Sequence, residues 1–299
     1  MRVVVLGSAA GGGVPQWNCA CPVCALAWSG DARVARRTQS SIAVTVDGDA
    51  FALVNASPDL RQQILATPVL HPRGGLRHSP IGGVIVTNAD VDHVAGLLTL
   101  RERQNLTLHA TTATLATLAA NAIFNVLAAE CVERRAIALN VPFAPLAQME
   151  VTAFALPGKV ALWLEGDQVE IGGENEATIG LEFKAGGKRV VYAPGCADVT
   201  DALLERVEGA DVLFFDGTTF ADDEMIAHGL SQKTAQRMGH TAMSGPEGAL
   251  KRFARAKIGR RIFIHINNSN PALIAGSPER ILVEDAGWEL AFDGMEVAP

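Results

Sequence analysis

The feature that most constrains this chain is a short apolar run that ends in a dense group of polar side chains. Residues 83–86 are glycine, valine, isoleucine and valine, and they predict a buried strand. Asp90, Asp92 and His93 follow, and from Val94 onward leucines recur at helical spacing. Such a turn lies at the carboxyl end of its strand, where α/β and sandwich folds place their chemistry. Two carboxylates and an imidazole there suit a metal ion; the alternative is an Asp or Asn helix N-cap followed by a solvated histidine.

Two other predicted strands end in polar side chains at the same edge. Residues 212–215 are wholly apolar and lead to Asp216, whose buried carboxylate needs a metal or a hydrogen-bond network to offset its desolvation. Residues 261–264 lead to His265, which is either a core histidine or a ligand. The sequence therefore predicts one site assembled from several strand ends.

Three cysteines stand close together in a C-x-C-x-x-C run, Cys19, Cys21 and Cys24. Thiolates at this spacing can converge on one ion, and they favour zinc. The alternatives are free thiols in a loop, or a redox or iron–sulfur role. A closed tetrahedral zinc site needs a fourth ligand from elsewhere in the chain.

Composition excludes several classes of function. The net charge is −7 and no basic patch is present, so nucleic acid is not expected as a partner. The glycine loop at residues 7–13 lacks both the dinucleotide spacing and the Lys-Ser/Thr of a phosphate loop, and predicts a tight turn near the site. No apolar run is long enough for a membrane span. The first residues predict a strand and no signal peptide, so we expect a cytoplasmic protein.

The remaining pattern predicts an α/β chain of one domain over 1–299, built from two similar halves. Residues 165–176 predict a mobile flap or a solvated hairpin, and Ser57 is the expected N-cap of a helix that begins at Pro58. The other expected elements are strands at 2–6, 40–46, 50–54, 106–110, 151–156, 161–164, 178–183, 188–193 and 288–292, and helices at 112–129 and 277–286.

The polar strand ends resemble the metallo-β-lactamase superfamily, whose signature is H-x-H-x-D-H after a strand. The resemblance implies a four-layer αββα sandwich. Asp92 and His93 match the second half of the signature and His265 matches the last histidine, whereas Asn88, Asp90 and Gly195 stand where other ligands are usual. A di-zinc hydrolase is therefore disfavoured, because the first metal would have few donors and the pair no bridge. Two histidines and one carboxylate remain, the ligand set of non-haem iron oxygenases, which zinc and manganese also accept.

Within the superfamily, residues 5–19, 37–43, 55–59 and 265–271 resemble the PqqB family of pyrroloquinoline quinone (PQQ) biosynthesis. That resemblance implies an iron-dependent, O₂-using hydroxylation of the tyrosine ring in a cross-linked Glu–Tyr diamino acid, inside a bacterium. Fe(II) would be held by Asp92, His93 and His265. Asp90 and Asp216 are further ligands or orient the histidines, and His240 is a ligand or a general base.

The resemblance also bears on the zinc and on partners. Related phosphodiesterases complete the cysteine site with a histidine three residues past the last active-site histidine, where this chain has Asn268. The fourth zinc ligand is therefore Asn268, His240 or His265, or the position is open. Other PQQ biosynthesis proteins are the expected partners, with a homodimer as one option. Arg37, Arg61 and Arg101 are candidates to bind substrate carboxylates by bidentate pairing, and a solvated arginine is the alternative for each. The competing functions are a carrier for PQQ or its precursor and a residual zinc hydrolase.

Overall fold

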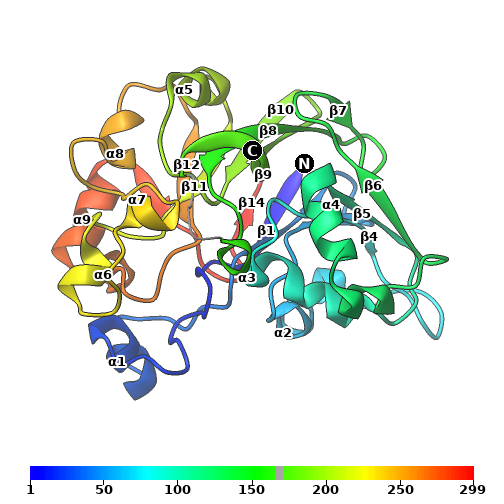
Figure 1. Cartoon of the computed structure of the whole chain (residues 1–299), viewed down its shortest axis with the longest axis horizontal. Coiled ribbons are helices and arrows are strands. Elements are labelled where there is room, and N and C mark those ends of the chain that lie inside the picture. The colour runs from blue at the N-terminus through cyan, green and yellow to red at the C-terminus, as the bar shows by residue number, and fades with distance from the viewer. Residues whose placement is uncertain (166–170) are drawn as a thin grey trace.

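Two seven-stranded sheets pack face to face in the computed structural model, which describes residues 1–165 and 171–299. Figure 1 shows helices α2 and α4 on one side of the sheets and α5, α8 and α9 on the other. This arrangement is the four-layer αββα sandwich, so the predicted fold class is confirmed. None of the described helices is long and apolar enough to cross a membrane.

The first sheet has the strand order β14-β1-β2-β3-β4-β5-β6. Pairing is antiparallel from β14 to β3 and parallel from β3 to β6. The two ends of the chain meet here, since β1 pairs with β14 (Figure 1). Its strands are β1 (Arg2–Gly7), β2 (Ser41–Thr45), β3 (Phe51–Val54), β4 (Ile81–Ile85), β5 (Leu106–Ala110), β6 (Val132–Ala136) and β14 (Glu296–Val297).

The second sheet repeats this scheme, with antiparallel pairs from β7 to β10 and parallel pairs from β10 to β13. Its order is β13-β12-β11-β10-β9-β8-β7. Parallel strands place their carboxyl ends at one edge, which is where the polar turns lie. The strands are β7 (Pro142–Phe143), β8 (Glu150–Gly158), β9 (Gly173–Ala185), β10 (Lys188–Ala193), β11 (Val212–Asp216), β12 (Arg260–Ile264) and β13 (Trp288–Leu290).

The helices are short, and most serve to cover the outer sheet faces. The described residues also form short 3₁₀ segments, namely η1 (Pro68–Leu70), η2 (Ala95–Leu100), η3 (Ala122–Val126), η4 (Leu162–Leu164) and η5 (Pro271–Leu273). The α-helices are α1 (Pro22–Ser29), α2 (Leu60–Ala66), α3 (Val91–Val94), α4 (Thr112–Ala119), α5 (Asp201–Val207), α6 (Glu224–Ala227), α7 (Ala235–Met238), α8 (Ala249–Arg252) and α9 (Pro278–Asp285).

Three apolar layers hold the sandwich together. The middle layer lies between the sheets and joins side chains such as Val44 and Leu181. A second layer packs α5, α8 and α9 on one outer face, and a third packs α2 and α4 on the other. Because each sheet is buried on both faces, strands such as β11 read as continuous apolar runs.

Several expected elements differ from the structure. The predicted helix 112–129 ends at Ala119, because the backbone is extended at Asn121 and Phe124 turns into the core. The predicted strand 161–164 is the 3₁₀ turn η4, and α2 begins at Leu60 with Asp59, not Ser57, as its N-cap. Strand β6 was not expected, because a charged edge strand lacks the apolar alternation of an inner one.

The expected flap or hairpin at 165–176 is only partly accounted for. Residues 166–170 lie outside the described residues, and residues 173–176 belong to the long strand β9. Glu165 itself is described, and its carboxylate contacts Lys159.

Candidate metal and active site

The polar turns after β4, β11 and β12 meet around one cavity of about 400 Å³. Ala10 and Gly11 of the glycine loop form part of its wall, and a Cβ atom at Gly11 would lie 3.6 Å from the Asp92 carboxylate. The other lining residues are Asn88, Asp90, Asp92, His93, Lys159, Leu162, Gly195, Thr218, Met225, Ser231, Lys233, Met238, His240, His265 and Asn267. The structure therefore brings together the strand ends that the sequence singled out.

Asp92, His93 and His265 form the floor of this cavity. Their ligand atoms lie within 4.8 Å of one another. The Asp92 Oδ2 atom is 3.1 Å from His265 Nε2 and 3.8 Å from His93 Nε2. Both histidines are buried, whereas the side chain of Asp92 is 14% exposed. These donors come from both sheets, since Asp92 and His93 lie in α3 and His265 follows β12.

The hydrogen bonds around His93 fix which ring nitrogen carries the proton. The Asn55 Oδ1 atom accepts from the Thr87 backbone N–H (2.9 Å) and from the Thr87 hydroxyl (3.1 Å). Because the hydroxyl has one hydrogen, its oxygen accepts from His93 Nδ1–H, 3.3 Å away. The Nε2 atom of His93 then keeps its lone pair, and among the described residues it has no hydrogen-bond partner despite being buried. A lone pair left in this way is suited to a metal ion.

Charge reinforces this arrangement of donors. Burial alone would raise the pKa of Asp92, but His93 and His265 hold it well below its usual range. Burial lowers the pKa of His93 and outweighs the attraction of Asp92, so the neutral ring is favoured. For His265, the hydrogen bond and charge of Asp92, aided by Asp216, outweigh burial and raise the pKa. The ionised Asp92 carboxylate therefore favours positive charge beside it, here on the His265 ring.

Asp216 and His240 form a second buried pair beside this floor. The carboxylate of Asp216 accepts from His240 Nδ1 (2.7 Å), Cys196 N (2.9 Å) and the Thr218 hydroxyl (2.7 Å). This network compensates the burial of Asp216, as the sequence required. The ring of His240 stacks on that of His265, with centroids 5.3 Å apart, and it lines the cavity. Its hydrogen bonds to other described residues are made through Nδ1. Asp216, His240 and His265 also offer ligand atoms within 4.8 Å of one another.

Asp90 lines the cavity, and one of its carboxylate oxygens is engaged outside the donor cluster. It stands at the N-cap position of α3, and its Oδ1 atom accepts from the Leu162 backbone N–H at 3.1 Å. Asp90 is not in either oxygen–nitrogen donor group found among the described residues. Asn88 in turn accepts from the Asp90 N–H at 2.9 Å. The Asp90 side chain therefore links the segment after β8, which contains Leu162, to the cavity wall.

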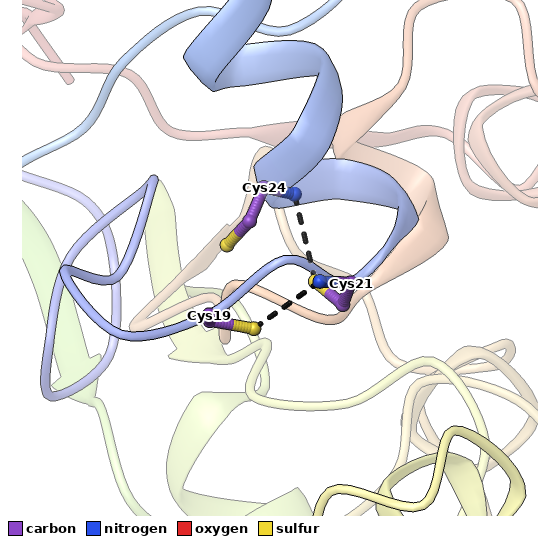
Figure 2. Close-up of side chains that lie close together, drawn as sticks. All are labelled: Cys19, Cys21 and Cys24. Atoms are coloured by element: carbon purple, nitrogen blue, oxygen red, sulfur yellow. Dashed lines mark hydrogen bonds between the residues drawn. The ribbon is translucent and has the colours of Figure 1, made fainter.

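The cysteine turn lies apart from the cavity and carries Cys19, Cys21 and Cys24 at the start of α1. Figure 2 shows the three side chains turned toward one another, and their sulfurs lie within 4.8 Å. The Asn268 amide lies against them, with Nδ2 3.2 Å from the Cys19 and Cys24 sulfurs. The amide oxygen and nitrogen are interchanged by a half-turn of the side chain, which would direct Oδ1 at the sulfurs. Of the three candidates for a fourth ligand, the structure places Asn268, and neither His240 nor His265, against the thiols.

Both clusters fit a metal ion by their chemistry. Three thiols lie together, and the Asn268 amide, turned so that Oδ1 faces them, would bring the number of donors to the four that structural zinc requires. Two imidazoles and a carboxylate leave positions open, and the 3.1 Å between Asp92 Oδ2 and His265 Nε2 is close to the ~3 Å expected for neighbouring ligands on one ion. The described residues thus supply one closed and one open donor set.

Sequence reasoning missed part of the cavity wall. Lys159, Lys233 and Leu162 line it, and the indole Nε1 of Trp163 donates to Ala89 O at 3.1 Å. No strand-end pattern marks these positions. The three arginines proposed for substrate do not line the cavity: Arg61 and Arg101 lie outside it, and Arg37 is buried against Ser8 and Ala291.

Comparison with known proteins gives the class first. The family model described as "Beta-lactamase superfamily domain" matches residues 52–266. Fold and donor sets together define a metal-binding member of the metallo-β-lactamase superfamily. The curated coenzyme PQQ synthesis protein B of Methylobacterium nodulans is 58% identical over 295 residues, covering 99% of both chains. That of Methylorubrum extorquens strain PA1 is 59% identical over the same length and share. The chain belongs to the coenzyme PQQ synthesis protein B family.

Solved structures agree with this placement. The crystal structure of Zn²⁺-bound PqqB from Methylobacterium extorquens has a TM-score of 0.99 and 57% identity, covering both chains completely. A diphosphatase of the PhnP family has a TM-score of 0.68 at 21% identity, over 99% of this chain and 97% of its own. The second likeness shows the fold alone.

Proposed function

We propose that this protein acts in PQQ biosynthesis, in the bacterial cytoplasm, as an iron-dependent hydroxylase of the tyrosine ring of the Glu–Tyr diamino acid. The names of relatives at 58% and 59% identity support the pathway. The observation that carries the chemistry is the open set of two imidazoles and one carboxylate at the floor of the cavity. Such a set leaves positions for O₂ and substrate.

The donor residues have a binding role in this proposal. Asp92, His93 and His265 hold Fe(II), which when bound supplies the redox chemistry of O₂. Thr87 and Asn55 hold the His93 ring with its Nε2 lone pair toward the ion. One oxygen atom enters the ring C–H bond and the other leaves as water, with two electrons from an added reductant and two protons.

His240 is the proposed general base for the phenol. Its Nε2 atom accepts the proton while Nδ1–H remains bonded to Asp216, whose negative charge stabilises the imidazolium that forms. Asp216 is a positioning residue in this role, since it acts through the ring. Asp90 has an anchoring role, because its carboxylate is bonded to the backbone of Leu162.

A residual zinc hydrolase is less well supported. Hydrolysis by two metals needs a clamp that holds them together. Gly195 offers no side chain at the expected bridging position, and Asn88 offers no imidazole. The carrier function remains as the outcome to expect if binding occurs without turnover.

The test is O₂ uptake by protein purified without oxygen and reconstituted with Fe(II), given the Glu–Tyr diamino acid and ascorbate. We expect a product heavier by one oxygen atom, and loss of both uptake and iron in His93→Ala with the fold retained. His71→Ala, which changes a histidine outside the cavity, is the matched control. Tight substrate binding with no iron-dependent oxygen uptake would overturn the hydroxylase in favour of a carrier.

For the cysteine turn we propose structural zinc, held by Cys19, Cys21, Cys24 and the Asn268 oxygen. The contact of Asn268 with all three sulfurs supports this ligand set. The turn is also joined to the cavity, since His265 and Asn268 belong to one loop after β12. Zinc content per chain, measured after mild chelation, tests it. Loss of tightly held zinc in Cys21→Ser but not in Cys131→Ser is the expected result.

A further inference from the structure

Two lysines, Lys159 and Lys233, line the same cavity as the donor cluster of Asp92, His93 and His265. Lys159 follows β8, and Lys233 precedes α7. Both contact the carboxylate of Glu165, with Nζ–O distances of 2.6 Å for Lys159 and 3.8 Å for Lys233. Apart from histidines, they are the basic residues among the described ones that line the cavity. The site therefore already binds a carboxylate, supplied by the protein itself.

The lysine that makes the shorter contact is held in place from several sides. Its side chain is 13% exposed, and that of Glu165 is 11% exposed. The backbone carbonyl of Lys159 accepts from the Thr178 hydroxyl at 3.1 Å. Gly239, with φ +91°, leaves room for the Lys159 stem, since a Cβ there would lie 3.2 Å from Lys159 Cγ. A rigid, nearly buried ammonium is a specific recognition element, because little freedom remains to be lost on binding.

The segment between Lys159 and Glu165 is fastened to the metal-site turn. The Leu162 N–H donates to Asp90, and the Trp163 indole donates to Ala89 O. These bonds hold the segment that carries Lys159 and Glu165 beside the turn of Asp92 and His93, which follow Asp90 after one intervening residue. Lys233 is joined to this segment through its contact with Glu165. A ligand carboxylate bound by the lysines would thus direct the rest of its molecule over the donor floor.

The charges of this cluster favour replacement of the Glu165 carboxylate by the carboxylate of a ligand. Two ammonium groups face one carboxylate among the described residues of this cluster, so one positive charge is left over. Lys159, with Lys233 and Arg237, holds the pKa of Glu165 below its usual range, so Glu165 is ionised and competes with an anionic ligand. Removing its charge should therefore strengthen ligand binding.

We infer that Lys159 and Lys233 form a subsite for a substrate carboxylate, in which Glu165 is the intramolecular competitor. This inference deepens the proposed function, on which it rests for the class of substrate, an amino acid or aromatic polycarboxylate. It replaces Arg37, Arg61 and Arg101 in that role, none of which lines the cavity.

The test measures binding without turnover. PQQ, an aromatic tricarboxylate, is titrated anaerobically into the zinc-loaded full chain by calorimetry, with quenching of Trp163 as a second signal, because its half-exposed indole lies beside the cavity. We expect Lys233→Met to weaken binding about tenfold and Lys159→Met about 10- to 100-fold, as for loss of a hydrogen bond to a charged group. Glu165→Gln should tighten it severalfold. The trimethyl ester of PQQ should bind weakly and respond to none of these changes.

Arg101→Met removes an equal charge from an exposed position outside the cavity and is the control for general electrostatics. Weakening of PQQ binding by Glu165→Gln, or equal effects of Lys233→Met and Arg101→Met, would overturn the subsite. Lys159→Arg should restore most of the affinity that Lys159→Met loses. The two proposals fail separately: oxygen uptake without lysine dependence refutes only the subsite, and lysine-dependent binding without uptake refutes only the hydroxylase.

Discussion

The two donor clusters of this protein differ in how the chain builds them. The cysteine turn takes its three thiols from residues 19–24, at the start of one helix. The cavity site takes Asp92 and His93 from the turn after β4 and His265 from the end of β12, in opposite sheets. The first cluster is closed by an amide and the second is open to a cavity. Closed sites stabilise a fold, whereas open sites leave room for a reactant.

This difference predicts opposite effects of emptying each site. Cys24→Ser should release zinc and lower the free energy of unfolding by at least ~3 kcal/mol, because binding energy of structural zinc is folding energy. His93→Ala should abolish iron binding but lower the free energy of unfolding much less. Thermal unfolding of both variants, followed with metal analysis, checks this. Cys131→Ser, outside the turn, is the control, and equal destabilisation by Cys24→Ser and His93→Ala would remove the distinction.

Within the cavity, Asp216 is expected to assist removal of the phenol proton by His240, and not to bind the metal. Asp216→Asn should lower kcat roughly 10²- to 10⁴-fold, the usual range for general-base catalysis, because the amide cannot hold His240 in the same tautomer. Iron content should stay at the level of the unchanged protein. His240→Asn should be equally slow, and the double variant no slower than either. Loss of iron from Asp216→Asn would instead make Asp216 a ligand.

The open site should also depend on its hydrogen-bonded supports. Thr87→Val removes the acceptor of His93 Nδ1–H and should weaken iron binding about 10- to 100-fold. Zinc at the cysteine turn should not change. Thr87→Ser keeps the hydroxyl and should retain the affinity. Competition with a chelator of known affinity gives the dissociation constants, and similar losses in Thr87→Val and Thr87→Ser would argue for a packing effect alone.

A further expected effect, on stability and not on either metal site, concerns the loop that connects the clusters. The Ser269 hydroxyl donates to the buried carboxylate of Glu224 at 2.5 Å, and Asn267 donates to Ser269 at 2.6 Å. Burial raises the pKa of Glu224 from 4.5 to about 7, despite these hydrogen bonds. The folded protein therefore binds this proton more tightly than the unfolded chain does. The resulting stability is complete below pH 4.5 and is lost as the pH rises through 7.

Glu224→Gln should remove this loss of stability, which amounts to about 3 kcal/mol for a pKa raised from 4.5 to about 7. The measurement is the free energy of unfolding in denaturant at several pH values from 5 to 8, and the slope should flatten in the variant. Glu247→Gln, whose side chain is 79% exposed, should leave the slope unchanged. An unaltered slope in Glu224→Gln would show that another group is responsible.

The same contrast, between a turn that is local in sequence and a site built from distant segments, explains which features the sequence could predict. The spacing of Cys19, Cys21 and Cys24 is local, so the turn could be anticipated without a fold. The strand ends at Asp92, Asp216 and His265 could be anticipated because apolar runs precede them. Their convergence followed from the resemblance and from the rule for parallel strands. Local patterns thus gave the elements, and the topology rule gave their meeting point.

The positions that were missed depend on contacts distant in sequence. Leu162 and Trp163 resemble a strand by composition. In the structure, however, the Leu162 backbone N–H and the Trp163 indole N–H donate to Asp90 and Ala89, in the turn that follows β4 of the other sheet. Lys159 and Lys233 are ordinary surface residues until the fold brings both to Glu165. Asn268 lies against the thiols through a loop 244 to 249 residues away. No local pattern records such contacts.

The loop after β12 also determines when, during synthesis of the chain, the two donor sets become complete. His265 completes the cavity site and Asn268 covers the thiols, yet the other donors, Cys19 to His93, are synthesised long before them. A nascent chain that has passed only α4 holds thiols and two early ligands, but neither site is whole. Ions captured at that stage could be exchanged freely, since the last donors are absent. With the proposed ligand sets, neither site can therefore be complete before β12 and the loop after it have been translated.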